Sequence, residues 1–324
     1  MNKGMKSISV LVTKNALIAA LGNTRYMFKK VNDFLVESGK KPVFHVDLVG
    51  LTEEVSLDDG LYKIQVDKVI DKCDKTDLLI IPPMGGDMFK NIDLNTSYID
   101  WIRMQYGKGT EIASLCVGAF LLAETGLLDG RECSTHWKTA NEFRERYPKV
   151  NLVDEKIITD FNGIYTSGGA NSYWNLLVHL VEKYTDRDLA IKTSKYFEID
   201  LNRNSQFPFM IFEGNKQHQD NLILNSQIFI EQNFKDKLTV DFLAENVNMS
   251  KRTFQRRFKK ATNYNALRYI QKVKVEVAKK HLENGVLTVN EIMYETGYND
   301  PKTFRDNFKK MTGVTPIQYK QRYS

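Results

Sequence analysis

A repeated pattern in the last hundred residues constrains the fold of this chain more than any other feature. The segment from Ser250, SKRTFQRRFKKATNYNALRYIQ, aligns with the segment from Asp300, DPKTFRDNFKKMTGVTPIQYKQ, at an offset of 50. In each copy two phenylalanines stand four residues apart, which places them on one face of a helix. Each copy also follows an LTV triplet, at Leu238 and Leu287, and a short apolar segment. A helix, a short turn and a basic helix, written twice, predict a tandem helix-turn-helix.

The first copy can be assigned residue by residue. Thr239 is expected to cap a short helix, and Ser250 the basic helix that follows a turn at Asn248–Met249. On this basic helix Phe254 and Phe258 are expected to face the core. The opposite, outward face carries Arg252, Gln255, Arg256 and Lys259. Because Arg and Gln can read guanine and adenine edges in the major groove, the helix is predicted to contact DNA bases.

The second copy has the same arrangement of two helices and a turn, but different residues mark the ends of its helices. Thr288 and Glu291 match a capping box, and Pro301 stands at the first position of the second basic helix. Its outward face carries Lys302, Arg305 and Lys309. The alternative is a pair of amphipathic hairpins with solvated basic faces. Two copies with intact turns and basic outer faces favour DNA binding over that alternative.

The distribution of charge agrees with this division of roles. The formal net charge is +6, yet residues 219–324 hold 19 Lys and Arg against 11 Asp and Glu, so the preceding part is slightly acidic. Only the C-terminal region is therefore expected to meet a polyanion.

Composition excludes several other classes of protein. No apolar run approaches the roughly 18 residues of a membrane span, so no membrane contact is expected. The three cysteines, Cys73, Cys116 and Cys133, follow no disulfide or metal spacing, which favours a reducing cytoplasm. The five histidines are scattered, so neither a metal nor a cofactor is expected.

Residues 1–198 show a different periodicity from the tail. Short strand-like segments, SISVLV, VFHVDLV, DLLIIP and EIASL, alternate with amphipathic ones. This alternation predicts an α/β domain with a mainly parallel sheet. Residues 199–220 lose the pattern and read as a linker around the apolar core FPFMIF, and residues 221–324 are helical throughout.

Cys116 ends the strand-like segment EIASLC and precedes a glycine and a helix-like pattern. A cysteine at such a turn can act as a nucleophile, line a ligand site, or fill the core. Nucleophilic work requires a thiolate, a nearby base and an oxyanion hole. Amides at the helix start could lower the thiol pKa and, with the Gly85–Gly86 backbone, hold an oxyanion.

The tail closely resembles the AraC/XylS family of transcription regulators over residues 221–324. The motif GYNDPKTFRDNFKKMTGVTPIQYK carries the resemblance. The resemblance implies two recognition helices in adjacent major grooves of promoter DNA, about 34 Å apart. Base contacts would come from Arg252, Gln255 and Arg256 on the first helix and from Lys302 and Arg305 on the second. Two residues depart from the family pattern: Asp306 stands where Arg is usual, and Asn263 where Gly is usual.

The front domain resembles the PfpI/ThiJ-like branch of the class I glutamine amidotransferase superfamily. The segments ASLCVGAFLLAETGLLDGRECSTHW, DLLIIPPMGGDM and IYTSGGANSYWNLLVHLVEKY carry this resemblance. It implies a flavodoxin-like fold. The combination with an AraC-type tail, together with RNSQFPF in the linker, is typical of the GlxA-like regulators.

This second resemblance also suggests a site. It implies a pocket for a small effector lined by Gly85, Gly86, Cys116, Val117, His136, Ser167 and Gly168. His136 would be the partner of Cys116, but the acid that catalytic relatives supply is missing, since Ala19 and Ala20 stand near its expected place and Trp137 and Lys138 follow the histidine. We therefore expect no catalytic residue and interpret Cys116 and His136 as vestigial.

Two functions from different classes remain at this point. The first is a ligand-responsive, DNA-binding transcription regulator, which we expect to be a homodimer through its front domain. The second is a cysteine-dependent enzyme of the amidase or hydratase kind with an appended DNA-binding domain. The missing acid favours the first, and the sequence does not name the effector.

Overall fold

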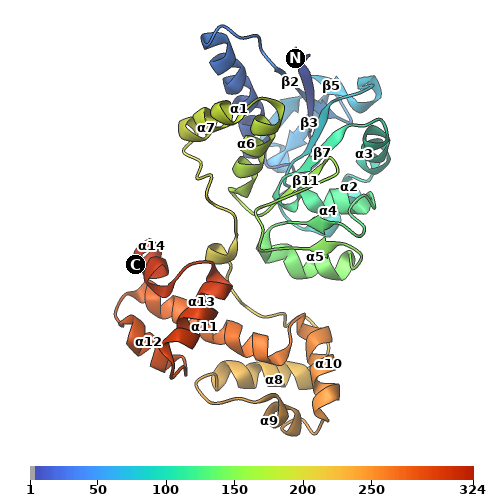
Figure 1. Cartoon of the computed structure of the whole chain (residues 1–324). Helices are drawn as coiled ribbons and strands as arrows, with labels where there is room; N and C mark the ends of the chain where they lie inside the picture. Colours follow the sequence, from blue (N-terminus) through green and yellow to red (C-terminus); the bar gives the residue numbers. More distant parts are fainter. Residues whose placement is uncertain (1–3) are drawn as a thin grey trace. The chain divides into compact units, whose positions relative to one another are not determined.

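The structure, a computed structural model, describes residues 4–324. The chain forms two compact units, the first ending at Gln206 and the second beginning at Phe207 (Figure 1). Among the described residues, no helix is long and apolar enough to cross a membrane.

A seven-stranded sheet forms the centre of the first unit. Its strands stand in the order β10 (Ile158–Phe161), β11 (Ile164–Ser167), β7 (Glu111–Ser114), β6 (Leu78–Ile81), β1 (Lys6–Leu11), β2 (Phe44–Gly50) and β5 (Lys68–Val69). All neighbours pair in parallel except β10 with β11. In chain order, β1, β2, β6, β7 and β11 give the arrangement 2-1-3-4-5 of flavodoxin-like folds. The predicted fold class is confirmed.

Helices cover both faces of this sheet (Figure 1). One side carries α1 (Ile18–Glu37), α6 (Ser172–Tyr184) and α7 (Arg187–Tyr196), and the other α2 (Met88–Leu94), α3 (Ser97–Gly107) and α4 (Ala119–Glu124). The parallel strands are buried on both faces; all four residues of β6, for example, are fully buried. Smaller elements complete the unit: a hairpin of β3 (Glu54–Leu57) and β4 (Tyr62–Gln65), the pair β8 (Glu132–Cys133) and β9 (Asn151–Leu152), and α5 (Ala140–Arg146).

The second unit is helical. Its helices are α8 (Asn221–Gln232), α9 (Val240–Glu245), α10 (Lys251–Thr262), α11 (Ala266–Asn284), α12 (Val289–Glu295), α13 (Pro301–Thr312) and α14 (Pro316–Tyr323). Two apolar cores lie within it, one for each helix-turn-helix. The long helix α11 contributes to both, with Val273 in the first core and Val275 in the second.

The end signals predicted for these helices are confirmed. The side chains of Thr239 and Ser250 accept hydrogen bonds from the first turns of α9 and α10. Thr288 and Glu291 form the capping box of α12. Asn263 ends α10 in the left-handed conformation, with φ of 65°, as its counterpart glycine does at the end of α13. Asparagine therefore takes the conformation that glycine usually supplies.

The segment predicted as a linker, residues 199–220, is divided between the two units. Residues up to Gln206 belong to the first unit, and the second begins with the 3-10 helix η5 (Phe207–Phe209). Further along, Phe212 packs edge-on against Tyr264 and Tyr269 in the first helical core.

Candidate nucleic-acid interface and effector site

The first recognition helix, α10, separates an apolar face from a basic one. Phe254 and Phe258 are fully buried in the first core. The side chains predicted to meet DNA are all exposed: Arg252, Gln255, Arg256 and Lys259. The surface they form is positive and carries side chains able to read bases. Their individual contacts with DNA stay predictions.

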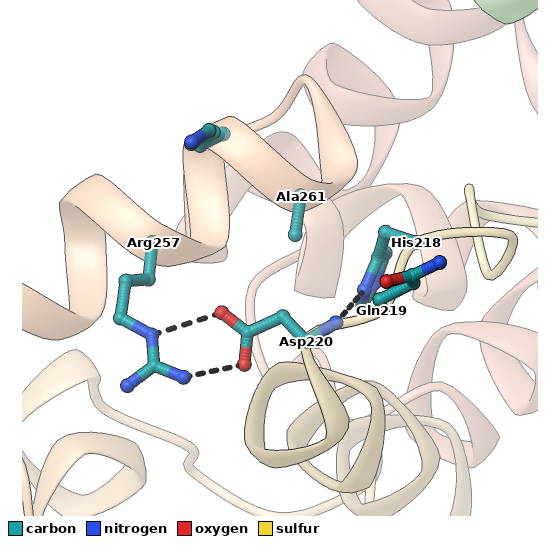
Figure 2. A pocket seen from close by; sticks show the side chains of 6 residues that line it. His218, Gln219, Asp220, Arg257 and Ala261 are labelled. Atoms are coloured by element: carbon teal, nitrogen blue, oxygen red, sulfur yellow. Dashed lines mark hydrogen bonds and ion pairs between the residues drawn. The ribbon is translucent and has the colours of Figure 1, made fainter.

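Arg257, which sequence reasoning did not single out, has a structural partner. Its guanidinium forms a two-point ion pair with Asp220, with Nε–Oδ2 and Nη2–Oδ1 distances of 2.9 and 2.7 Å (Figure 2). Asp220 also accepts from the Ile223 amide as the N-cap of α8. Two parallel bonds fix direction as well as distance, so the pair orients α10 relative to α8. The hydrogen bonds from Arg257 are the main cause that lowers the pKa of Asp220.

This ion pair lies beside a surface pocket of about 480 Å³ lined by His218, Gln219, Asp220, Arg257, Lys260 and Ala261 (Figure 2). His218 Nδ1 accepts from the Asp220 amide at 3.2 Å, and Nε2 faces the Gln227 side-chain oxygen at 2.7 Å. These partners require the proton on Nε2. The loop before α8 is therefore held at both its backbone and its histidine ring.

The second recognition helix, α13, has the same core face but a different outer face. Phe304 and Phe308 are buried, and Lys302, Arg305 and Lys309 are exposed as predicted. Two differences from α10 stand out. Arg305 Nε donates to the Pro301 carbonyl of its own helix at 3.2 Å. An exposed acid, Asp306, lies next to it in the chain.

The turns of the two copies are built from different residues. Asn248 adopts a left-handed conformation in the first turn, with φ of 53°. Gly297, at the matching place in the second, has φ of 70°. A Cβ atom on Gly297 would lie 2.3 Å from the Lys235 carbonyl oxygen. Only glycine fits the second turn, whereas the first accommodates a side chain.

In the first unit, Cys116 occupies a strained turn between β7 and α4. Its φ is 55°, an uncommon value for a residue with a side chain. Gly118 allows the turn to approach β6, because a Cβ there would lie 2.7 Å from the Pro82 carbonyl oxygen. The predicted strand-to-helix elbow is present. Strained backbone of this type is often found at binding and catalytic sites.

The hydrogen bonds around Cys116 come from two neighbouring segments. Its amide donates to Ser167 Oγ at 3.1 Å, and Thr135 Oγ1 donates to its carbonyl at 3.1 Å. Burial raises the pKa of the thiol and outweighs the backbone N–H groups of Ala170 and Val117, which favour the thiolate. Burial at this position therefore disfavours the thiolate form of Cys116.

His136 is oriented by backbone and not by an acid. Its Nδ1 accepts a hydrogen bond from the Lys138 amide at 3.1 Å. Its ring packs on Gly169, where an added Cβ would lie 2.4 Å from the ring. Burial, and to a lesser extent the charge of Lys138, lowers the pKa of His136. A triad histidine instead donates from Nδ1 to a carboxylate, so this arrangement does not prepare a general base.

The glycine turn after β6 is held by its own hydrogen bonds. The Gly85 amide donates to the Asn15 carbonyl at 2.9 Å, and Asn91 Nδ2 donates to the Gly85 carbonyl at 2.7 Å. Gly86 has φ of 80°. The Gly85 amide thus maintains the turn instead of pointing free toward an oxyanion. A role for this turn in lining a pocket stays a prediction.

Two residues near the elbow were missed by sequence reasoning. Asn23 on α1 donates from Nδ2 to the hydroxyl of Tyr173 on α6 at 2.8 Å. Burial raises the pKa of Tyr173, and the hydrogen bond from Asn23 opposes this shift. An amide and a phenol thus link α1 to α6. Because 150 residues separate Asn23 from Tyr173 in the chain, no local sequence pattern could indicate this contact.

The described part of the chain contains no cluster of three His, Cys, Asp or Glu side chains arranged to hold a metal ion.

Comparison with known families matches both units. The DJ-1/PfpI family matches residues 32–183, and a helix-turn-helix domain family matches residues 243–322. Among solved structures, a ThiJ/PfpI family protein from Pseudomonas syringae has a TM-score of 0.51 at 16% identity, covering 71% of this chain and 87% of that one. A protein from Vibrio parahaemolyticus has a TM-score of 0.53 at 21% identity, covering 59% and 98%. These two structures support the fold of the first unit.

Two proteins named as transcription regulators are similar to this chain over most of its length. The HTH-type transcriptional regulator GbdR of Pseudomonas aeruginosa is 25% identical over 99% of this chain and 85% of its own length. The HTH-type transcriptional regulator GlxA of Rhizobium meliloti is 25% identical over 74% of this chain and 73% of its own. The chain thus combines a unit that matches the DJ-1/PfpI family with a unit that matches a helix-turn-helix domain family, and it is similar over most of its length to proteins named as HTH-type transcriptional regulators.

Proposed function

We propose that this chain is a sequence-specific DNA-binding regulator of transcription whose first unit binds a small-molecule effector. The observation that carries the proposal is the pair of recognition helices. Each has a buried phenylalanine pair on one face and exposed Lys and Arg side chains on the other. The regulators GbdR and GlxA support the same function.

The first unit is proposed to sense and not to catalyse. A nucleophilic cysteine needs a thiolate and an oriented base. Cys116 instead has a raised pKa, and the Nδ1 atom of His136 accepts from backbone. The residues proposed to line the effector pocket are Gly85, Gly86, Cys116, Val117, His136, Ser167 and Gly168. A cysteine-dependent amidase or hydratase is the alternative, because the DJ-1/PfpI fold includes enzymes.

DNA binding is tested with the full chain and a duplex site selected from random sequence. Several Lys and Arg contacts to phosphate release counterions, so log K against log salt is expected to have a slope of roughly −4 to −8. Replacing Arg252, Gln255 and Arg256 by alanine together is expected to abolish preference for the selected site. Lys149→Ala, an exposed change in the first unit, is the control. Absence of binding at low salt would refute the proposal.

The reactivity of Cys116 separates the sensor from the enzyme. Because burial raises its pKa, alkylation by iodoacetamide is expected to be slow at pH 7 and to accelerate only above the usual thiol range near 8.5. Peptide mapping distinguishes Cys116 from the buried Cys73 and Cys133, and glutathione is the reference thiol. Cys116→Ser is expected to preserve folding and DNA binding. Rapid alkylation at pH 6, with loss of regulation in the serine variant, would support the enzyme.

The proposed regulator is expected to act as a homodimer through its first unit. Sedimentation of the full chain tests this directly, and a monomer at micromolar concentration would contradict it. A thermal-shift screen of small nitrogenous metabolites is the corresponding search for the effector.

A further inference from the structure

Gln206, the last residue of the first unit, carries an almost completely buried carboxamide. Its side chain is part of a residue only 1% exposed. Oε1 accepts from the Gly169 amide at 2.6 Å. Nε2 lies within hydrogen-bond distance of the carbonyl oxygens of Asp154, Thr135 and Lys156, at 2.8, 3.0 and 3.2 Å. The residue that ends the first unit is thus buried and hydrogen-bonded like a core residue.

These partners are specific for a primary amide. The Gly169 amide is a donor, so it requires an acceptor, and the carbonyl oxygens require donors on the other side. A carboxylate would place a negative oxygen against the carbonyls, and an apolar side chain would leave buried polar groups unpaired. The site also fits the carboxamide closely in size, because a Cβ atom added to Gly168 would lie 2.4 Å from the carboxamide carbon of Gln206. The loops form a binding site for a carboxamide, and Gln206 occupies it.

The same loops surround Cys116. The Thr135 carbonyl accepts a hydrogen bond from Gln206, and the Thr135 hydroxyl donates one to the Cys116 carbonyl. Gly169 holds Gln206, and the next residue, Ala170, directs its backbone N–H to the Cys116 thiol. The ring of His136 packs on Gly169. Any rearrangement of these loops around an effector would change the bonds that hold Gln206.

The residues that follow Gln206 are fixed within the second unit. Gly313, the C-cap of α13, lies against Phe207. A Cβ atom added to Gly313 would be 3.8 Å from the Cβ atom of Phe207. Tyr323 donates to the Pro208 carbonyl at 3.2 Å. The buried Lys279 of α11 donates to the Met210 carbonyl at 2.6 Å. Gln206 and the residues that follow it are therefore anchored in different units, although they are consecutive in the chain.

We propose that Gln206 is the positioning residue that connects the effector site to the DNA-binding unit: its carboxamide holds the linker in the loops around Cys116 and is released when those loops rearrange. This inference rests on the proposed function, since it describes how the first unit controls the second. The site itself is proposed to recognise small primary carboxamides whenever Gln206 is absent.

Hydrogen exchange of residues 204–212 in the full chain tests the anchor. Gln206→Ala is expected to accelerate exchange there at least ten-fold, because the backbone loses its side-chain anchor. Asn204→Ala removes an exposed carboxamide two residues away and is expected to leave exchange unchanged. Gln206→Glu keeps the shape of the side chain and is expected to accelerate exchange as the alanine variant does. This second variant provides the same test if Gln206→Ala fails to fold. Equal exchange in the Gln206 and Asn204 variants would overturn the proposal.

Chemical rescue tests the specificity of the site. Acetamide replaces the atoms that Gln206→Ala removes, and at tens of millimolar it is expected to restore slow exchange of the Gly169 amide, which Gln206 Oε1 holds in the parent chain. Acetate, of similar size but with no N–H, is expected to have no effect. Equal rescue by acetate, or none by acetamide, would contradict a carboxamide site.

Coupling to Cys116 is tested by Thr135→Val, which removes one hydroxyl with little change of shape. In the parent chain this variant is expected to accelerate exchange of residues 204–212 and to change affinity for the selected DNA site. In the Gln206→Ala chain it is expected to add nothing, which is the signature of residues acting together. Additive effects would refute the coupling. A parent chain that binds no DNA would instead refute the proposed function, because the exchange measurements need no DNA.

Discussion

The two helix-turn-helix copies share one architecture but differ in how their recognition helices are fixed. Both α10 and α13 bury a phenylalanine pair. Only α10 adds the two-point ion pair between Arg257 and Asp220, and α13 has the uncharged Asn307 at the position of Arg257. A guanidinium held at two points orients a helix more strictly than apolar packing alone.

The outer, solvent-exposed faces of α10 and α13 also differ. The exposed Arg256 of α10 has Gln255 beside it, and both residue types can read base edges. On α13, Arg305 bonds to its own helix and Asp306 brings a negative charge next to it. We therefore expect the first copy to supply most of the sequence preference and the second to act mainly through phosphate contacts.

The largest expected effect concerns the turns. Gly297→Ala places a Cβ against the Lys235 carbonyl and strains a φ of 70°, so it is expected to cost about 3 kcal/mol or more of unfolding free energy. Asn248→Ala, at the matching turn, is expected to cost about 1 kcal/mol. Urea denaturation measures both. Equal costs would show that the two turns are equivalent.

The second largest difference is expected when an arginine is replaced on the outer face of each recognition helix. Arg256→Ala is expected to cost about 1–3 kcal/mol on the selected site and to relax preference at one or two base pairs. Arg305→Ala should cost less and change preference little. Lys259→Ala is expected to weaken selected and random DNA alike, which makes it the control for lost charge. If Arg305→Ala exceeds Arg256→Ala, the division between the copies is wrong.

A smaller effect is expected from the ion pair that orients α10. Arg257→Gln should weaken binding to the selected site more than to random DNA, although Arg257 itself is not expected to contact bases. Asp220→Asn should have the same effect and add little to the first change. Additive losses would indicate that Arg257 contacts DNA directly.

The same pair has a pH dependence of known sign. Because Arg257 lowers the pKa of Asp220, the pair's stabilisation is complete above the unfolded value near 3.9 and is lost as pH falls through the lower folded value. Parent and Asp220→Asn chains should therefore converge in stability below that range.

The smallest effect is expected from Asp306→Arg, which removes the acid from the outer face of α13. Affinity for both selected and random DNA should rise by about 0.5–1 kcal/mol, with a steeper salt dependence by up to about two units. Unchanged affinity at low salt would show that this face lies away from DNA.

Sequence patterns were sufficient for features that repeat locally. The buried phenylalanines, the caps at Ser250 and Thr288 and the exposed basic faces all follow from helical spacing, and alternating segments predicted the parallel sheet. Long-range pairs carried no such signal. Arg257 and Asp220 are 37 residues apart, and the partners of Gln206 come from three separate loops. Such contacts depend on how the chain folds back on itself, which periodicity does not encode.

The shared helix α11 has a consequence for how this protein can change over time. At 1.5 Å per residue its 19 residues span about 28 Å, and the residues of both cores are fixed along it. Inserting one residue between Val273 and Val275 would turn the second copy by about 100°, out of phase with the groove. Inserting seven would nearly restore the direction of the second copy and would move it about 10 Å further along α11. Outer-face substitutions can therefore alter which bases are read one at a time, whereas an insertion in α11 changes both the direction and the position of the second copy at once.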